Sequence, residues 1–169
     1  MRLLSKRITS HLQKIVGQKL KDVDLFCFDY EIDPPAMENL PFYFGNELVL
    51  NFEKDIAIIT WDENAGWREH FSLYVGCERL YLPISSLIKW NVSKLKPWQN
   101  CIDRELTFTR IYSQNQTPHV VKLNFADTVI FVGDSSENRF GDGDDLLITN
   151  ELLDNDYGKW NMIWEVKDT

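Results

Sequence analysis

The sequence lacks long apolar runs. A membrane-spanning helix needs about twenty consecutive apolar residues, and the longest apolar stretches here are short ones such as residues 56–61. The first sixteen residues also lack the continuous apolar core of a secretory signal, because basic and polar side chains interrupt them. We therefore expect a cytoplasmic protein without a membrane span.

Cysteine is also scarce. The sequence has three cysteines, Cys27, Cys77 and Cys101, at wide spacing and without a Cys-x-x-Cys pair. This pattern suits neither a disulfide framework nor a zinc site, and glycine-rich phosphate-binding fingerprints are missing from the sequence as well. We expect reduced, buried thiols and no cofactor. Asn91-Val-Ser93 and Asn115-Gln-Thr117 match the glycosylation pattern, but a match of three residues carries little weight without evidence of secretion.

The composition is that of a chain that folds. Apolar residues make up 44% and aromatic residues 13% of the 169 residues. A chain of this length buries enough surface to hold a core without metal or disulfides, and its aromatic side chains contribute large buried areas. We predict a single domain over residues 1–169.

Charge is unevenly distributed along the chain. Eighteen Lys and Arg against twenty-six Asp and Glu give a net charge of −8. Residues 1–21 carry six bases and no acid, whereas residues 126–156 carry nine acids and one arginine, which is −8 in that stretch alone. Subtracting the +6 of the first segment from −8 leaves −14 for residues 22–169. Because phosphate binding needs clustered bases, we expect no nucleic-acid partner.

The basic N-terminal segment has a helical pattern. Leu4, Ile8, Leu12 and Ile15 recur at intervals of three and four residues, and Gly17 follows as a helix cap. One interpretation is a cationic amphipathic helix that lies on a membrane or nucleic acid. The other is a helix over residues 3–16 that docks its apolar stripe on a sheet, and we favour it because helices that cover a core are the common case.

After Gly17 the apolar pattern changes to period two, which is typical of strands. Alternating segments include residues 23–27, 48–52, 56–58, 71–75, 121–125, 129–131 and 160–166, and residues 146–149 supply a further short apolar strand. Their connections are too short for the crossover helices that parallel strands require. We predict an α+β fold with an N-terminal helix and about eight to ten mostly antiparallel strands, plus a short helix over residues 85–90.

The two halves of the chain have a similar order of strands and turns. A displacement of 73 positions superimposes Leu50-Asn51-Phe52 on Leu123-Asn124-Phe125, with apolar, turn and apolar segments on both sides. One interpretation is an internal duplication of a β-meander, residues 18–83 and 100–167, with residues 84–99 as the connector. The other is that any two meander hairpins with alternating faces look alike.

An acidic, glycine-bearing segment follows the second hairpin and is the most prominent local feature. Its acidic side chains are Asp134, Glu137, Asp142, Asp144 and Asp145. They predict either a surface for a basic protein partner or, through Asp142, Asp144 and Asp145, a calcium site. The spacing does not fit an EF-hand, because Arg139 stands at the sixth position of a loop that begins at Asp134, where glycine is needed.

Two tryptophans flank the polar residues 62–66. If Trp61 and Trp67 are exposed, they predict an aromatic platform for a sugar face or a protein anchor, since exposed tryptophan is typical of binding hot spots. The alternative is that both cover the ends of the core.

Catalysis has little support in the sequence. None of the three histidines, His11, His70 and His119, stands in a motif with a serine or cysteine nucleophile. We therefore lean against an enzyme. The function we expect is a non-catalytic acidic protein-binding module, for example an immunity or inhibitor protein that neutralises a basic partner. Two alternatives stay open, a calcium- or carbohydrate-binding β domain and a hydrolase with a concave pocket lined by perturbed acids or by His70.

Overall fold

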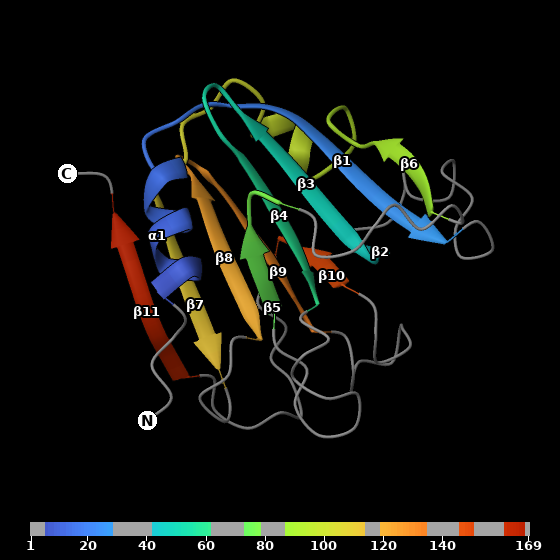
Figure 1. The fold of residues 1–169 in the computed structure, drawn as a ribbon. Helices are drawn as coiled ribbons and strands as arrows, with labels where there is room; N and C mark the ends of the chain where they lie inside the picture. Colours follow the sequence, from blue (N-terminus) through green and yellow to red (C-terminus); the bar gives the residue numbers. More distant parts are fainter. Residues whose placement is uncertain are drawn as a thin grey trace.

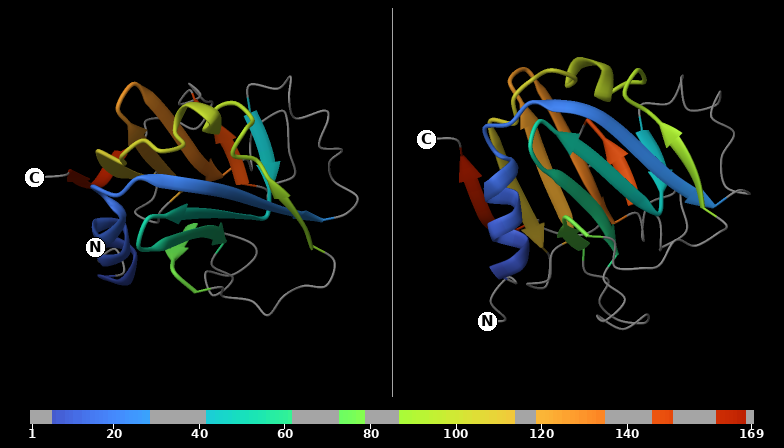
Figure 2. Two further views of the ribbon diagram at one scale, coloured as in Figure 1. Left: turned by 90° about the horizontal axis from the view of Figure 1, so that it is seen from above. Right: turned by 45° about the horizontal axis from the view of Figure 1, so that its top comes forward.

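A computed structural model describes residues 6–28, 42–61, 73–78, 87–113, 119–134, 146–150 and 161–167. These residues form one α-helix, one 3-10 helix and eleven strands in two sheets. The sheets lie face to face, with the helix beside them at one side (Figures 1 and 2). All strand pairs within the sheets are antiparallel. The predicted α+β class, mostly antiparallel with an N-terminal helix, is confirmed.

The first sheet has five strands in the order β5-β4-β3-β1-β6. Their bounds are β1 Leu20–Phe28, β3 Glu47–Phe52, β4 Ile56–Trp61, β5 Leu73–Gly76 and β6 Leu87–Asn91. The second sheet has six strands in the order β11-β7-β8-β9-β10-β2. Their bounds are β2 Phe42–Gly45, β7 Phe108–Ser113, β8 Val120–Phe125, β9 Thr128–Asp134, β10 Leu146–Thr149 and β11 Asn161–Lys167.

The chain follows the same path in both sheets. In the first sheet β1, β3, β4 and β5 lie in sequence order, and β6 then returns to the outer edge of β1. In the second sheet β7, β8, β9 and β10 lie in sequence order, and β11 returns to the outer edge of β7. Only β2, which adds to β10, has no counterpart in the first sheet among the described strands. This shared path supports the predicted duplication, which stays a prediction.

The core lies between the two sheets because apolar residues alternate along each strand. Inward positions of β1, β3 and β8 are 0–6% exposed, and the facing side chains pack as in a β-sandwich. The outward positions differ between strands. On β3, β4 and β5 most of them are buried as well, whereas β6, β7 and β11 expose theirs at least in part. The more exposed outer surfaces therefore lie over β6 with its neighbour β1, and over β11 with its neighbour β7.

Helix α1, Lys6–Ile15, docks by the predicted stripe. Ile8, Leu12 and Ile15 are 0–8% exposed, and α1 contacts β4, β5 and β11. The helix ends at Ile15, one residue before the predicted end, and Gly17 follows it with a φ of 84°, the left-handed conformation that favours glycine after a helix C-terminus. His11, which is also buried, bonds through Nε2 to the backbone oxygen of Ile56 at 2.8 Å and ties the helix to β4.

A pair of phenylalanines connects the two sheets at equivalent positions. Phe52 ends β3 and Phe125 ends β8, and the two are related by the same displacement of 73 residues that superimposes the hairpins. Their rings stack across the core, with centroids 6.5 Å apart and planes inclined by 12°. Each ring therefore contacts the ring at the equivalent place along the path of the other sheet.

Two expectations need correction, one strand was missed, and the eleven strands exceed the eight to ten that were expected. The short helix predicted over residues 85–90 is wrong where the structure describes it, since Leu87–Asn91 is strand β6 on the edge of β1; backbone pairing outweighed the local pattern. Strand β2 was not predicted, because four residues after a proline-rich segment carry almost no periodicity. Cys27 and Cys101 are buried, but Cys77 is exposed.

Candidate binding surfaces

Most residues predicted to bind a partner lie outside the described residues. These are Trp67, Glu137, Asp142, Asp144 and Asp145. Trp61 ends β4 and Asp134 ends β9, so their backbones lie in different sheets, and the structure describes neither side chain. Asp134 pairs with Leu146 of β10, so the two ends of the predicted acidic loop are held on neighbouring strands.

The described residues hold no group of three His, Cys, Asp or Glu side chains that would bind a metal ion. The predicted calcium ligands Asp142, Asp144 and Asp145 are outside that set, so the calcium alternative stays a prediction. Within the described ranges, α1 is also too short and too polar to be a membrane span, and no other helix qualifies.

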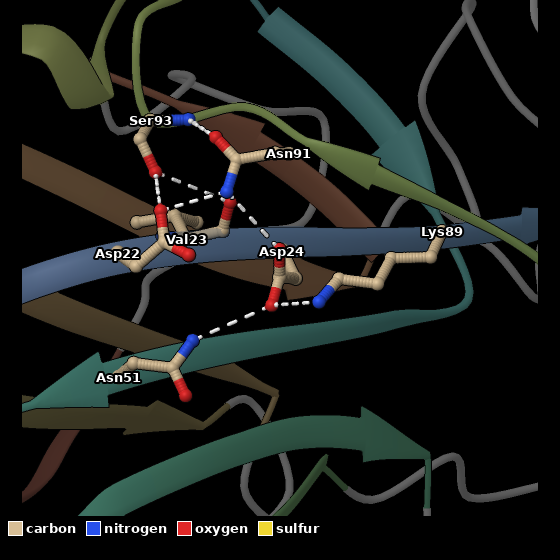
Figure 3. A network of polar contacts seen from close by, with 7 residues as sticks. All are labelled: Asp22, Val23, Asp24, Asn51, Lys89, Asn91 and Ser93. Carbon is tan, nitrogen blue, oxygen red and sulfur yellow. Dashed lines mark hydrogen bonds and ion pairs between the residues drawn. The ribbon is translucent and has the colours of Figure 1, made fainter.

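A polar network lies on the outer face of the first sheet, where β3 and β6 flank β1 (Figure 3). Because Val23 and Leu25 point into the core, Asp22 and Asp24 stand on the opposite face of β1. Side chains from the neighbouring strands and from Ser93, just after β6, converge on these two carboxylates.

Asp24 is the buried member of this network. Its side chain is 7% exposed, and Oδ2 forms an ion pair with Lys89 Nζ at 2.8 Å. Asn91 Nδ2 donates to Oδ1 at 3.2 Å and Asn51 Nδ2 donates to Oδ2 at 3.4 Å. Donors from β3 and β6 thus satisfy a carboxylate that is expensive to bury alone.

Asp22 is partly exposed. It accepts hydrogen bonds from Asn91 Nδ2 at 2.7 Å and from Ser93 Oγ at 2.5 Å. Ser93 Oγ in turn accepts from the backbone N–H of Val23 at 2.8 Å. Burial raises the pKa of Asp22, but the donors Asn91 and Ser93, the Val23 amide and the charge of Lys89 together outweigh it and hold the pKa below its usual value of 3.8.

An aspartate with a lowered pKa is a weak base, so the geometry gives Asp22 a structural rather than a general-base role toward Ser93. The arrangement instead attaches edge strand β6 and the turn after it to β1. Asn91 and Ser93 belong to the glycosylation pattern, but in the structure both side chains form hydrogen bonds within the network. The Asn91 amide group donates to both aspartates.

The sequence contained only a faint signal for this network. The alternation of Asp24 with Val23 and Leu25 placed one carboxylate on the outer face. Asn91 and Ser93 stand about seventy positions away, 69 and 71 from Asp22. Because β6 was predicted as a helix, its pairing with β1 could not be foreseen.

The second sheet carries an ion pair at the matching place. Asp24 of β1 is opposite Val49 of β3, and Arg110 of β7 is opposite Lys122 of β8. Because Lys122 is 73 positions after Val49, Asp24 and Arg110 hold equivalent places in the two sheets. Arg110 forms an ion pair with Glu165 of β11, just as Asp24 pairs with Lys89 of β6. The pairs occupy equivalent strands, and their signs are reversed.

Known proteins give no further guide to these surfaces. No protein-family model, no curated protein and no solved structure matches the chain. The site must therefore be interpreted from its own geometry and charge.

Proposed function

We propose that the protein is a non-catalytic, cytoplasmic binding module whose acidic surface engages a basic protein, as an immunity or inhibitor protein does when it neutralises its target. Opposite potentials speed the encounter of two such proteins and fix their relative orientation. The binding residues on this proposal include the acids of the predicted loop, Glu137 to Asp145.

The observation that carries this proposal is the position of the basic helix. α1 contacts β4, β5 and β11. Two strands lie within the acidic stretch, β9 and β10. β10 is separated from β11 by β7, β8 and β9 in the strand order, and Figure 1 shows α1 and β10 on opposite sides of the sandwich. The described part of the basic segment therefore does not lie against β10, and this supports the proposal that the acids of residues 126–156 serve a partner rather than the basic helix.

The network on β1 adds fixed negative charge. The hydrogen-bond donors around Asp22 favour its ionised form, and one lysine, Lys89, forms an ion pair with Asp24. Carboxylates that are already held in place lose little side-chain entropy when a partner binds.

The test is affinity capture from the source cells at low salt, followed by titration of the purified partner. The expected partner is basic, and its affinity should fall steeply between low and high ionic strength because screening weakens exposed charge pairs. The proposal would be refuted if the captured partner bound with an affinity that does not depend on ionic strength, or if no partner were captured.

Matched charge variants locate the surface. Asp142→Asn with Asp144→Asn removes two negative charges from the predicted loop and should weaken binding by about tenfold. The control is Glu53→Gln with Asp103→Asn, which removes two negative charges beside Lys21 and should change the affinity by no more than about twofold. Equal effects of the two pairs would show that net charge alone is sensed, with no defined surface.

A further inference from the structure

The outer face of the second sheet carries a cationic surface in an acidic protein. It lies where β11, β7 and β8 are adjacent. We call it the cation face and define it by Phe108, Arg110, Tyr112, Lys122, Glu165 and Lys167. Three bases against one acid give it a net charge of +2, whereas the chain as a whole carries −8.

Most of this surface is already held in place. The Arg110 guanidinium forms an ion pair with Glu165 and lies 4.9 Å from the ring centroid of Phe108. Lys167 Nζ lies 3.2 Å from the other oxygen of Glu165. The interaction with Glu165, and then with Tyr112, raises the pKa of Arg110. Arg110 and Lys167 thus already have Glu165 as a partner.

Lys122 is different. Its Nζ lies 5.4 Å from the ring centroid of Phe108 and 5.5 Å from that of Phe131. Among the described residues no carboxylate forms an ion pair with it and no acceptor bonds to it. Burial, and then the charge of Arg110, lowers the pKa of Lys122. A partly buried ammonium of this kind gains more from an incoming anion than a fully solvated one.

The surroundings of Lys122 resemble the core of a protein interface. Arginine, tyrosine, phenylalanine and methionine are the residue types enriched there. Tyr112 lies on the same face, and Met162, which is opposite it in the strand register, is 54% exposed. An apolar side chain of a partner would therefore find Tyr112 and Met162 on the same face as the ammonium.

We propose that the cation face docks an acidic peptide segment of a partner protein, with a carboxylate of that segment bound by Lys122 beside Arg110 and an apolar neighbour packed on Tyr112 and Met162. A nucleic acid fits less well, because Glu165 stands on the same face and one available ammonium neutralises few phosphates. The proposal does not rest on the proposed function, since the surface is different and the charge of the partner segment is opposite.

The probe is a labelled synthetic peptide that repeats Glu-Leu-Ser, titrated against the full chain, with a Gln-Leu-Ser peptide as its uncharged match. The acidic peptide should bind with a Kd at or below about 1 mM, and the uncharged one should not. Backbone amide NMR shifts should concentrate on β7, β8 and β11.

The variant that tests the site is Lys122→Met. Methionine keeps an apolar stem between the two rings and makes favourable sulfur–aromatic contacts, so the variant should fold with unchanged or higher stability. It should weaken peptide binding by about tenfold through loss of a charge-assisted contact. The control is Lys54→Met, an equal change of charge in the exposed turn between β3 and β4, which should leave the affinity within about twofold.

Several results would overturn the proposal. The first is that Lys122→Met binds the acidic peptide as tightly as the wild type, and the second is that the uncharged peptide binds as well as the acidic one. The third is that the amide NMR shifts are confined to strands other than β7, β8 and β11. The fourth is that polyuridylate binds more tightly than the acidic peptide. Self-association that Lys122→Met abolishes would also overturn it, because the occupant would then be a second copy of this chain. None of these results depends on Asp142 or Asp144, so each leaves the proposed function to its own test.

Discussion

Removal of the Ser93 hydroxyl should destabilise the fold by more than any exposed serine would. Ser93 is 9% exposed, and its Oγ accepts from the Val23 amide at 2.8 Å while it donates to Asp22 Oδ1 at 2.5 Å. In Ser93→Ala, the buried amide of Val23 loses this acceptor and the ionised Asp22 loses a donor.

The magnitude follows from these two losses. A buried N–H without an acceptor costs about 1–3 kcal/mol, and a hydrogen bond to a charged group contributes about 1.5–3 kcal/mol. Because Asp22 is partly exposed, we use the low end for the second. Ser93→Ala should therefore lower the free energy of unfolding by about 3 kcal/mol and the Tm by roughly 10 °C.

A double-mutant cycle separates the two losses. In the background of Asp22→Asn, Ser93→Ala should cost about 1.5 kcal/mol less, because the charged hydrogen bond is already gone. The measurement is urea denaturation followed by circular dichroism at about pH 7. The control is Ser113→Ala, which removes a buried hydroxyl that has no hydrogen-bond partner in the described structure and should be neutral or slightly stabilising.

The same cycle predicts a pH dependence. The pKa of Asp22 is lowered in the folded state, so its contribution to stability is present above the unfolded pKa and is lost as the pH falls through the folded pKa. The difference in unfolding free energy between the wild type and Ser93→Ala should therefore become smaller as the pH is lowered from about 5 to about 2. Two results would refute the network. One is a loss of unfolding free energy in Ser93→Ala that is no larger than the loss in Ser113→Ala. The other is a loss that stays the same over this pH range and is the same with Asp22 and with Asp22→Asn.

Three further predictions test the packing. Leu12→Ala, which truncates a fully buried side chain of α1, should cost about 2–5 kcal/mol in urea denaturation, and a loss below about 1 kcal/mol would mean that the helix is not docked. Ala126→Gly should raise the Tm, because Ala126 has a φ of 48° in the β8–β9 turn, where a side chain costs about 1–2 kcal/mol; a lower Tm would contradict this turn. A thiol reagent should label Cys77 quickly but Cys101 only on unfolding, since burial raises the pKa of Cys101 to about 12, and equal rates would contradict that burial.

The sequence predicted the parts of the fold whose pattern repeats along a single segment. The apolar stripe of Ile8, Leu12 and Ile15 predicted both the helix and the side of it that is buried. Alternation of apolar residues predicted the hairpins β3–β4 and β8–β9 and which of their residues face the core. Edge strands β2 and β6 were missed because they are short and take their stability from the neighbouring strand rather than from local pattern.

The candidate surfaces were predicted less well because they join distant segments. The bases of the cation face come from three strands. Arg110, Lys122 and Lys167 are each the single basic residue of their strand, so no run of bases marks the face in the sequence. Charge counted along the chain shows clusters that are contiguous in sequence, such as residues 126–156, and does not show those that strand pairing assembles. An acidic total therefore concealed a cationic face.

The stacked rings of Phe52 and Phe125 have a meaning beyond packing. When two identical chains form a two-fold dimer, a residue touches its own copy only beside the symmetry axis. Phe52 and Phe125 hold such a position between two sheets of the same path. The two sheets of the sandwich thus follow one path, as two chains of a dimer would, and within a single chain the two sheets need not carry the same side chains. Asp24 and Arg110 show what that freedom permits, since one scaffold position carries opposite charges on the two faces of one molecule.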